Sequence, residues 1–212
     1  MNNPQKVAII GGTGKAGRHI AAEALQKGYQ VRMLVRDPGK LKHLDKSIEI
    51  VKGSIQDIEA IRLLLKGCGT VINTFGQPYK DKPIYRESTE NILDAMKEFE
   101  IRRYIGVTGG SLTIEGDKKS IWNRIGAKMF DIFLSTMMKD KKREWEILNE
   151  TEHIEWTLIR LPFIIDGIKT AHIKENLVDM PGTKITNQDI ASFIISQIND
   201  FKYIKKAPFI SH

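Results

Sequence analysis

The sequence has a single cysteine, few histidines and no long apolar run. One cysteine, Cys68, excludes an intramolecular disulfide, and the five histidines form no close pair with the spacing of metal ligands. A charged residue interrupts every apolar run well short of the roughly 20 residues that a membrane-spanning helix needs. The first six residues lead directly into Val7–Ile10, which leaves no room for the apolar core of a secretion signal. These absences predict a protein of the reducing cytoplasm with no metal and no membrane partner.

Positive charge is in excess, with 33 Lys and Arg against 26 Asp and Glu and a formal net charge of +7. Such an excess can attract an anionic partner such as nucleic acid. The basic residues are nevertheless spread along the chain, mostly beside acidic ones, which is typical of a solvated surface. We therefore expect a small-molecule partner and no nucleic acid, and the sequence carries no signal for an oligomeric state. The two basic clusters are Lys139, Lys141, Lys142 and Arg143, and Lys202, Lys205 and Lys206.

Short apolar runs alternate with amphipathic segments along the whole chain. The runs are rich in Val and Ile, as strands buried on both faces of a parallel sheet require, and the segments between them have helical spacing. With 212 residues, the chain is long enough for one sizeable core. The sequence predicts an α/β fold in which residues 1–212 form a single Rossmann-type domain, a doubly wound parallel sheet with helices on both faces. The expected strands are Val7–Ile10, Gln30–Val35, Ile48–Val51, Thr70–Thr74, Arg103–Val107 and Trp156–Ile159.

The later part of the chain is less regular. A helical stretch from about Ser120 to Glu150 has apolar residues on one side and a charged second half, and we expect its methionines to fill the core. Residues 161–184 show no clear periodicity, and we expect them to border the substrate cleft. Thr186, followed three residues later by Asp189, predicts the N-cap of a closing helix. The apolar residues of the long stretch are Ile121, Ile125, Met129, Ile132 and Phe133.

A glycine-rich turn follows the first expected strand. Gly11, Gly14 and Gly17 form a G-x-x-G-x-x-G pattern between an apolar strand and an amphipathic helix. One glycine permits the tight turn, one lets the backbone approach a pyrophosphate, and one lets the helix pack near the strand, while main-chain amides at the helix N-terminus receive the negative charge. Because the strand, the helix and the next strand supply the required context, the pattern predicts a nicotinamide dinucleotide site rather than a plain turn.

Arg36 ends the second expected strand, about 20 residues after the glycines. NAD-selective sites usually place an acidic residue there, whereas an arginine pairs with the 2′-phosphate of NADP. Lys15 in the glycine turn adds a second positive charge. A surface salt bridge is the alternative role for Arg36, and Asp37 could accept a ribose hydroxyl instead. We therefore predict NADP as the cofactor, with NAD possible.

With these residues in place, the chain resembles the atypical short-chain dehydrogenase/reductase superfamily. The similarity is to the small NmrA-like branch that includes flavin reductase and biliverdin reductase B-like proteins, and it covers nearly the full length. Beyond the glycine turn, it is carried by several segments that lie after expected strands or near the C-terminus. These are residues 35–38, 53–57, 71–76, 156–162, 185–191 and 206–210.

The resemblance implies further contacts with the cofactor. Ile55 and Asp57 would lie near the adenine, residues 74–76 would line the cofactor, and Pro162 and Phe163 would lie near the nicotinamide. Ligands bind at the carboxyl ends of parallel strands, which these residues follow. Core packing is the alternative role for Phe75 and Phe163. The predicted cofactor-binding residues are Gly11, Gly12, Thr13, Gly14, Lys15, Ala16, Gly17, Arg36, Ile55, Asp57, Thr74, Phe75, Gly76, Thr108, Pro162 and Phe163.

One departure from the larger superfamily concerns its Tyr-x-x-x-Lys pair, in which lysine lowers the pKa of a tyrosine that exchanges a proton with the substrate. The corresponding helix, from Trp122 onward, has no tyrosine. We assign that role to none of Tyr79, Tyr85 and Tyr104. Ser111, after the fifth strand, is the candidate for orienting an acceptor, although a serine there can also cap a turn.

Two functions fit this pattern. The first is an NAD(P)H-dependent reductase that transfers a hydride directly to a small flat acceptor, such as a flavin, a quinone or a similar carbonyl compound, without a Tyr-x-x-x-Lys pair. The second is a non-catalytic NADP-binding redox sensor of NmrA type that regulates a protein partner.

Overall fold

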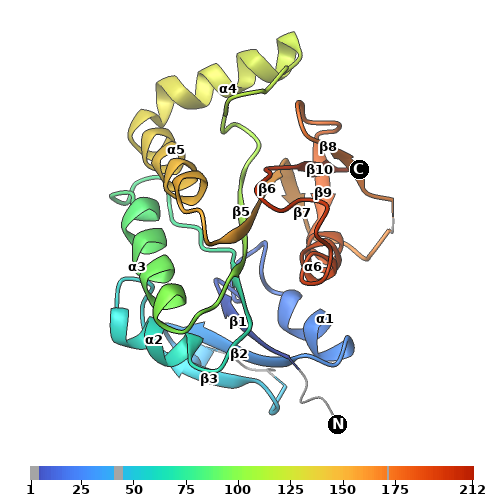
Figure 1. The fold of residues 1–212 in the computed structure, drawn as a ribbon. Helices are drawn as coiled ribbons and strands as arrows, with labels where there is room; N and C mark the ends of the chain where they lie inside the picture. The colour runs from blue at the N-terminus through green and yellow to red at the C-terminus, as the bar shows by residue number, and fades with distance from the viewer. Residues whose placement is uncertain (1–4, 41–44, 171) are drawn as a thin grey trace.

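A computed structural model describes residues 5–40, 45–170 and 172–212, and Figure 1 shows the arrangement of the elements. The helices are α1 (Ile20–Gln26), α2 (Ile58–Leu65), α3 (Tyr85–Glu98), α4 (Ile121–Phe133), α5 (Ser135–Glu150) and α6 (Asn187–Ser196), with a 3-10 turn at Pro38–Lys40. The strands are β1 (Lys6–Ile10), β2 (Gln30–Val35), β3 (Glu49–Lys52), β4 (Thr70–Asn73), β5 (Arg103–Gly109), β6 (Glu155–Leu161), β7 (Phe163–Ile165), β8 (Lys174–Asn176), β9 (Lys184–Thr186) and β10 (Phe209–Ser211).

The main sheet has the strand order β3-β2-β1-β4-β5-β6-β10-β8. All neighbouring strands are parallel except β8, which pairs antiparallel with β10 at the edge. The order reverses between β1 and β4, so the loops after these strands diverge and leave a crevice, which is the usual ligand site of such sheets. A separate two-stranded sheet pairs β7 with β9.

Helices cover both faces of the sheet (Figure 1). On one face, apolar residues of α2, α3 and α5 pack on side chains of β1, β4 and β5, with Trp156 of β6 fully buried among them. On the other face, α1 and α6 pack on the alternate side chains of the same strands, such as Ile9 and Ile72. Successive side chains of a strand point to opposite faces, so buried strands need apolar residues at every position. The short Val- and Ile-rich runs meet this requirement.

These features confirm the predicted α/β fold and the six predicted strands, whose observed ends lie within two residues of the expected ones. Thr186 caps α6 as expected, since its hydroxyl accepts a hydrogen bond from the main-chain N–H of Asp189 at 3.2 Å. The strands β7, β8 and β9 lie at least partly within residues 161–184, for which the sequence showed no periodicity. No helix in the described part of the chain is both long and apolar enough to cross a membrane.

The long helical stretch differs from its expectation. It is divided at Leu134, whose φ of −125° and ψ of 36° end α4 and start α5. The apolar side of α4 does not enter the core, since Met129 and its apolar neighbours on that side are exposed. Only the methionines of α5, Met137 and Met138, are buried as predicted. The periodicity correctly indicated that α4 has an apolar face, but it did not indicate that this face is exposed.

Candidate functional site

A large cleft opens at the carboxyl ends of the parallel strands. Its volume is about 1040 Å³, which is at the upper end for a ligand site and large enough for a dinucleotide together with a second small molecule. Its lining consists of residues at or just after the ends of β1, β2, β4, β5 and β6, together with residues of α4 and α5. Among the predicted site residues, those in its lining are Gly11, Thr13, Gly14, Lys15, Ala16, Arg36, Ile55, Thr74, Phe75, Gly76, Thr108, Ser111, Pro162 and Phe163.

The glycines of the turn are required by close backbone packing. Gly11 has a φ of +76°, and a Cβ atom there would lie 2.6 Å from the carbonyl carbon of Thr74. A Cβ atom on Gly17 would lie 2.5 Å from the Thr74 hydroxyl, and one on Gly14 would lie 3.2 Å from the Gly11 carbonyl oxygen. Gly12 lies behind the cleft, against Met33 and Ile9. The turn is therefore held against the end of β4, as the predicted roles of the glycines require.

The main chain of the turn presents unused donors to the cleft. The N–H groups of Thr13, Lys15 and Ala16 donate no hydrogen bond to any other described residue, while that of Gly14 bonds to the Gly11 carbonyl at 2.9 Å. Helix α1 begins only at Ile20, so residues 12–19 form successive turns rather than the helix mouth that the sequence predicted. Open N–H groups that line a cleft suit an anionic ligand. The turn therefore fits a pyrophosphate.

Two positive side chains line the cleft. Arg36 follows β2 and is exposed, and Lys15 projects from the glycine turn. In the part of the chain that the structure describes, neither forms an ion pair, so the surface salt bridge considered for Arg36 is not formed there. Both charges remain available to a ligand phosphate.

Asp57 lies apart from the cleft lining. Its carboxylate caps α2 by accepting hydrogen bonds from the N–H groups of Glu59 and Ala60, at 3.1 and 3.2 Å. Ile55, two residues earlier, is buried and does line the cleft. The geometry thus gives Asp57 a helix-capping contact, and it brings Ile55 rather than Asp57 to the expected adenine side.

The residues after β4 line the cleft beside the glycine turn. The Thr74 hydroxyl donates to the Ile10 carbonyl at 3.0 Å, which ties β4 to β1. Phe75 is partly buried and packs against the Tyr85 ring, with 5.5 Å between ring centroids, so it has the packing role considered as its alternative. Phe163 is 74% exposed at the cleft rim, which excludes core packing for it.

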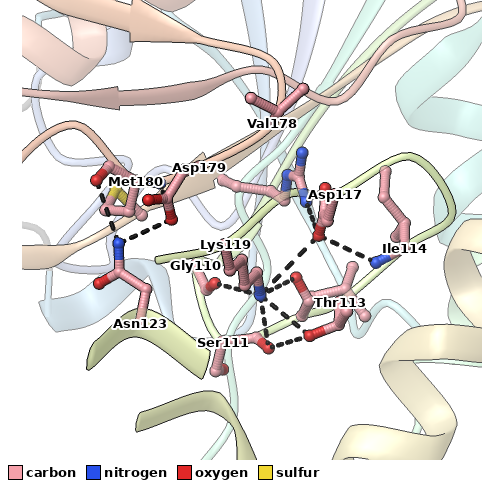
Figure 2. Close-up of polar contacts among 12 residues, drawn as sticks. Gly110, Ser111, Thr113, Ile114, Asp117, Lys119, Asn123, Val178, Asp179 and Met180 are labelled. Carbon is pink, nitrogen blue, oxygen red and sulfur yellow. Dashed lines mark hydrogen bonds and ion pairs between the residues drawn. The ribbon is translucent and has the colours of Figure 1, made fainter. Parts of the chain in front are cut away.

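A buried lysine fixes the loop that carries Ser111. The Lys119 side chain is 5% exposed, and its ammonium donates to the carbonyl oxygens of Gly110, Ser111 and Leu112 at 3.1, 3.2 and 2.9 Å (Figure 2). It also donates to the Thr113 hydroxyl at 3.0 Å. Burial lowers the pKa of Lys119 to about 8, although nearby carboxylates oppose the shift. Residues 110–113, which follow β5, thus all bond to the ammonium group of Lys119.

The hydrogen bonds from Lys119 hold Ser111 at the cleft. The Ser111 hydroxyl is half-buried, and its one described contact is a weak one, to the Met138 sulfur at 3.7 Å. Asp117, which ends the loop, is paired with the fully buried Arg160 at 2.7 Å. A ligand oxygen would therefore meet a hydroxyl whose position is fixed but whose hydrogen-bonding capacity is largely unused.

Sequence reasoning missed Lys141, which lies at the back of the cleft. Its ammonium lies 4.0 Å from the centroid of the Tyr85 ring and donates to the Thr108 hydroxyl at 3.4 Å. Burial lowers its pKa and raises the pKa of the Tyr85 phenol. The helical spacing of Met137, Lys141, Glu144 and Leu148 could have indicated that Lys141 lies on the inward face of α5.

Glu144, one turn after Lys141, is buried between α3 and α5. It accepts a hydrogen bond from the Thr89 hydroxyl at 3.4 Å, and its second oxygen has no hydrogen-bond partner among the described residues. Burial raises its pKa to about 7, although the Lys141 charge acts in the opposite direction. A carboxyl group that exchanges its proton near neutral pH thus lies directly behind the cleft.

Comparisons with known proteins agree with this geometry. A family model described as NAD(P)H-binding matches residues 11–201. The chain belongs to this NAD(P)H-binding family. The match agrees with the predicted resemblance and supports a nicotinamide dinucleotide as the cofactor.

Two curated relatives match most of this chain. The chain is 45% identical over 205 residues to a photosystem II assembly factor, Ycf39, of Trieres chinensis, covering 90% of this chain but only 58% of that protein. An uncharacterised protein, YwnB, of Bacillus subtilis is 24% identical over 154 residues, which cover 73% of this chain and 70% of YwnB.

Two solved structures show the same fold at low identity. A short-chain dehydrogenase/reductase from Veillonella parvula in complex with NADP has a TM-score of 0.78 at 14% identity, covering 98% of this chain and 94% of that one. The anaerobillin reductase ChuY of Escherichia coli O157:H7 has a TM-score of 0.79 at 15% identity, covering 98% and 97%. This chain therefore has an NAD(P)H-binding, reductase-like fold.

Proposed function

We propose that this protein is an NADPH-dependent reductase that passes a hydride to a small, flat acceptor such as a flavin or a quinone, with residues 1–212 forming one NAD(P)-binding domain. The observation that carries the proposal is the single cleft in which a phosphate-binding turn and an aromatic rim occur together. Flat ring systems stack on exposed aromatic side chains, which bind them without specific polar contacts. The rim residues are Tyr79, Trp122, Phe130 and Phe163.

The turn and its charges would hold the dinucleotide. The open N–H groups of Thr13, Lys15 and Ala16 would receive the pyrophosphate, and Arg36 with Lys15 would pair with a 2′-phosphate, which NADP has and NAD lacks. The bound cofactor supplies the hydride, so the protein itself needs to provide only orientation and a proton. The preference for NADP over NAD rests on Arg36.

Lys141 is the residue best placed to supply the proton. Its lowered pKa makes the ammonium a stronger acid than an exposed lysine, and its three donors are not saturated by the single contact to Thr108. Ser111 would orient the acceptor from the other side, through its largely unused hydroxyl. Together these groups can replace the tyrosine that the helix lacks.

The test combines binding with turnover. Titration calorimetry measures the affinity for NADPH and NADH, and oxidation of NADPH is then followed with a panel of flavins, quinones and carbonyl compounds. We expect turnover with at least one flat acceptor. In the variant Lys141→Met, general acid catalysis is lost, and the turnover number should fall about 100-fold or more. Lys142→Met, an exposed neighbour on the same helix, is the matched control.

The redox sensor is the competing outcome of this test. If NADPH binds but no acceptor in the panel is reduced, the reductase proposal fails. Partner capture with the protein loaded with either NADPH or NADP then tests the sensor. A partner retained by one redox form only would support it.

A further inference from the structure

Helix α4 carries its apolar side chains outward. Six large apolar side chains on it are between 50% and 81% exposed. At 100° per residue they fall within an arc of about 120°, centred opposite Ala127, the residue by which the helix is buried. A helix of a globular domain normally turns its apolar stripe to the core. The exposed residues are Ile121, Trp122, Ile125, Met129, Ile132 and Phe133.

Basic side chains flank this apolar stripe. Residues 118–139 contain five Lys and Arg residues and a single acidic one, Asp131. Arg124 and Lys128 lie side by side along one edge of the stripe, are exposed, and form no ion pair with any described residue. Lys118, just before α4, is exposed as well. An apolar stripe with a basic edge is typical of helices that lie on anionic lipid.

Two further exposed apolar side chains lie in the turn after β8, which is bonded to the start of α4. Leu177 and Val178 are exposed there, and the main-chain N–H of Lys118 donates to the Val178 carbonyl at 2.9 Å. Asp179 accepts hydrogen bonds from the Ser120 N–H at 3.0 Å and the Asn123 side chain at 2.7 Å (Figure 2). These bonds fix the start of α4 against the turn. In Figure 1, α4 runs along one edge of the molecule, where a flat surface can approach it.

We propose that α4 and the 177–178 turn dock the protein on an anionic lipid bilayer, with α4 lying in the plane of the surface. Such a helix needs no spanning segment, because its apolar side enters only about 5–10 Å below the headgroups. The basic edge would meet the anionic headgroups, whose negative surface potential attracts Lys and Arg side chains. The side of α4 that borders the cleft, at Gly126 and Ala127, would face away from the lipid. This inference does not depend on turnover.

A second copy of the chain fits the stripe less well. A helix of 13 residues is about 20 Å long and 10 Å wide, so paired stripes would cover on the order of 200 Å² per copy. A stable interface needs about 800 Å² per partner. The net charge of +7 also repels a second copy and attracts an anionic surface. Area and charge therefore both favour the bilayer.

Vesicle sedimentation of the full chain tests the proposal. We expect the protein to bind vesicles of phosphatidylcholine with phosphatidylglycerol at least about tenfold more tightly than vesicles of phosphatidylcholine alone, and added salt should weaken binding. Trp122 is the exposed tryptophan, whereas Trp156 is buried. Its emission should shift to shorter wavelength and be quenched by brominated lipid, and the variant Trp122→Phe should lose both signals.

Matched variants separate docking from general surface effects. The double variant Ile132→Ser/Phe133→Ser alters exposed residues outside the cleft lining and should lose vesicle binding, whereas Phe201→Ser should retain it, because Phe201 is 68% exposed but lies outside α4. Arg124→Gln/Lys128→Gln should weaken binding about tenfold or more, and Lys27→Gln/Lys97→Gln should change it less. Thermal unfolding confirms that each variant folds.

Three results would overturn the proposal. The first is no binding to anionic vesicles by a folded protein. The second is equal loss of binding in the α4 variants and in their controls. The third is a dimer in light scattering that Ile132→Ser/Phe133→Ser dissociates while vesicle binding is absent, which would mean that a second copy covers the stripe.

Discussion

Two glycines with nearly the same backbone conformation allow the role of the phosphate-binding turn to be measured. Gly11 has a φ of +76° and Gly28 a φ of +82°, both in the left-handed region that side chains rarely adopt. A Cβ atom on Gly28 would meet no atom within 4 Å, whereas one on Gly11 would lie 2.6 Å from both the carbonyl carbon and the oxygen of Thr74. Both variants, Gly28→Ala and Gly11→Ala, therefore place alanine in an unfavourable backbone conformation. Only Gly11→Ala also creates a steric clash.

The two costs can be worked out separately. Placing alanine in the left-handed region destabilises a protein by about 1–2 kcal/mol, and Gly28→Ala should show only this loss. Gly11→Ala adds overpacking against backbone, which costs about 1–3 kcal/mol more, because Thr74 is anchored to Ile10 by its hydroxyl and cannot move freely. To relieve the contact, the turn must move by more than about 0.5 Å, the tolerance of a preorganised site. We expect the NADPH affinity of Gly11→Ala to fall about tenfold or more.

Urea denaturation gives the free energy of unfolding of each variant, and calorimetry gives its affinity for NADPH. Gly28→Ala should bind NADPH like the unmodified protein, because it lies after α1 and away from the cleft lining. The reasoning is refuted if the two variants lose equal stability, or if Gly11→Ala binds NADPH with unchanged affinity.

Three further predictions concern single side chains of the site. Arg36→Ala should weaken NADPH binding about tenfold and leave NADH binding unchanged, because one exposed charge-assisted pair with the 2′-phosphate is lost; equal losses in calorimetry would contradict it. Lys119→Met should lower the free energy of unfolding by about 2 kcal/mol, since the carbonyls around Ser111 lose their donor, and unchanged urea midpoints would refute this. Burial raises the pKa of Glu144 to about 7 from 4.5, so the folded protein binds the extra proton between these values and its stability should fall by about 3 kcal/mol as pH rises through this window. Glu144→Gln should flatten that fall in urea denaturation at pH 5 and pH 7.5, and an unchanged slope would count against the assignment.

The fold was predictable from the sequence because its strands are buried on both faces. Each strand of a doubly wound sheet needs apolar residues at consecutive positions, so Val7–Ile10 and Gln30–Val35 stand out without any alignment. The glycine turn was predictable for a related reason, since backbone packing against Thr74 leaves no room for a side chain. Features for which the local backbone geometry allows few residue types can therefore be predicted from the sequence.

The rest of the site depends on contacts between distant segments. Lys141 and Lys142 are chemically alike, and only the fold brings Lys141 rather than Lys142 to the cleft, over the Tyr85 ring. Asp57 looked like an adenine contact, but it also suits a helix N-cap, which is where the structure places it. The apolar stripe of α4 has the period of a core helix, yet its side chains are exposed. The periodicity of a helix shows which residues share its apolar face, but only the tertiary structure shows whether that face packs on the core or is exposed.

The contact between Tyr85 and Lys141 differs in geometry from a Tyr-x-x-x-Lys pair. In a Tyr-x-x-x-Lys pair one helix carries both groups, and the lysine makes the phenol the acid. Here the phenol comes from α3 and the ammonium from α5, and the ammonium lies over the face of the ring rather than at its hydroxyl. The hydroxyl instead accepts a hydrogen bond from the Gln77 N–H at 3.3 Å. Burial raises the pKa of the phenol and lowers that of the ammonium, so the phenol is a weaker acid and the ammonium a stronger acid than the same groups in water.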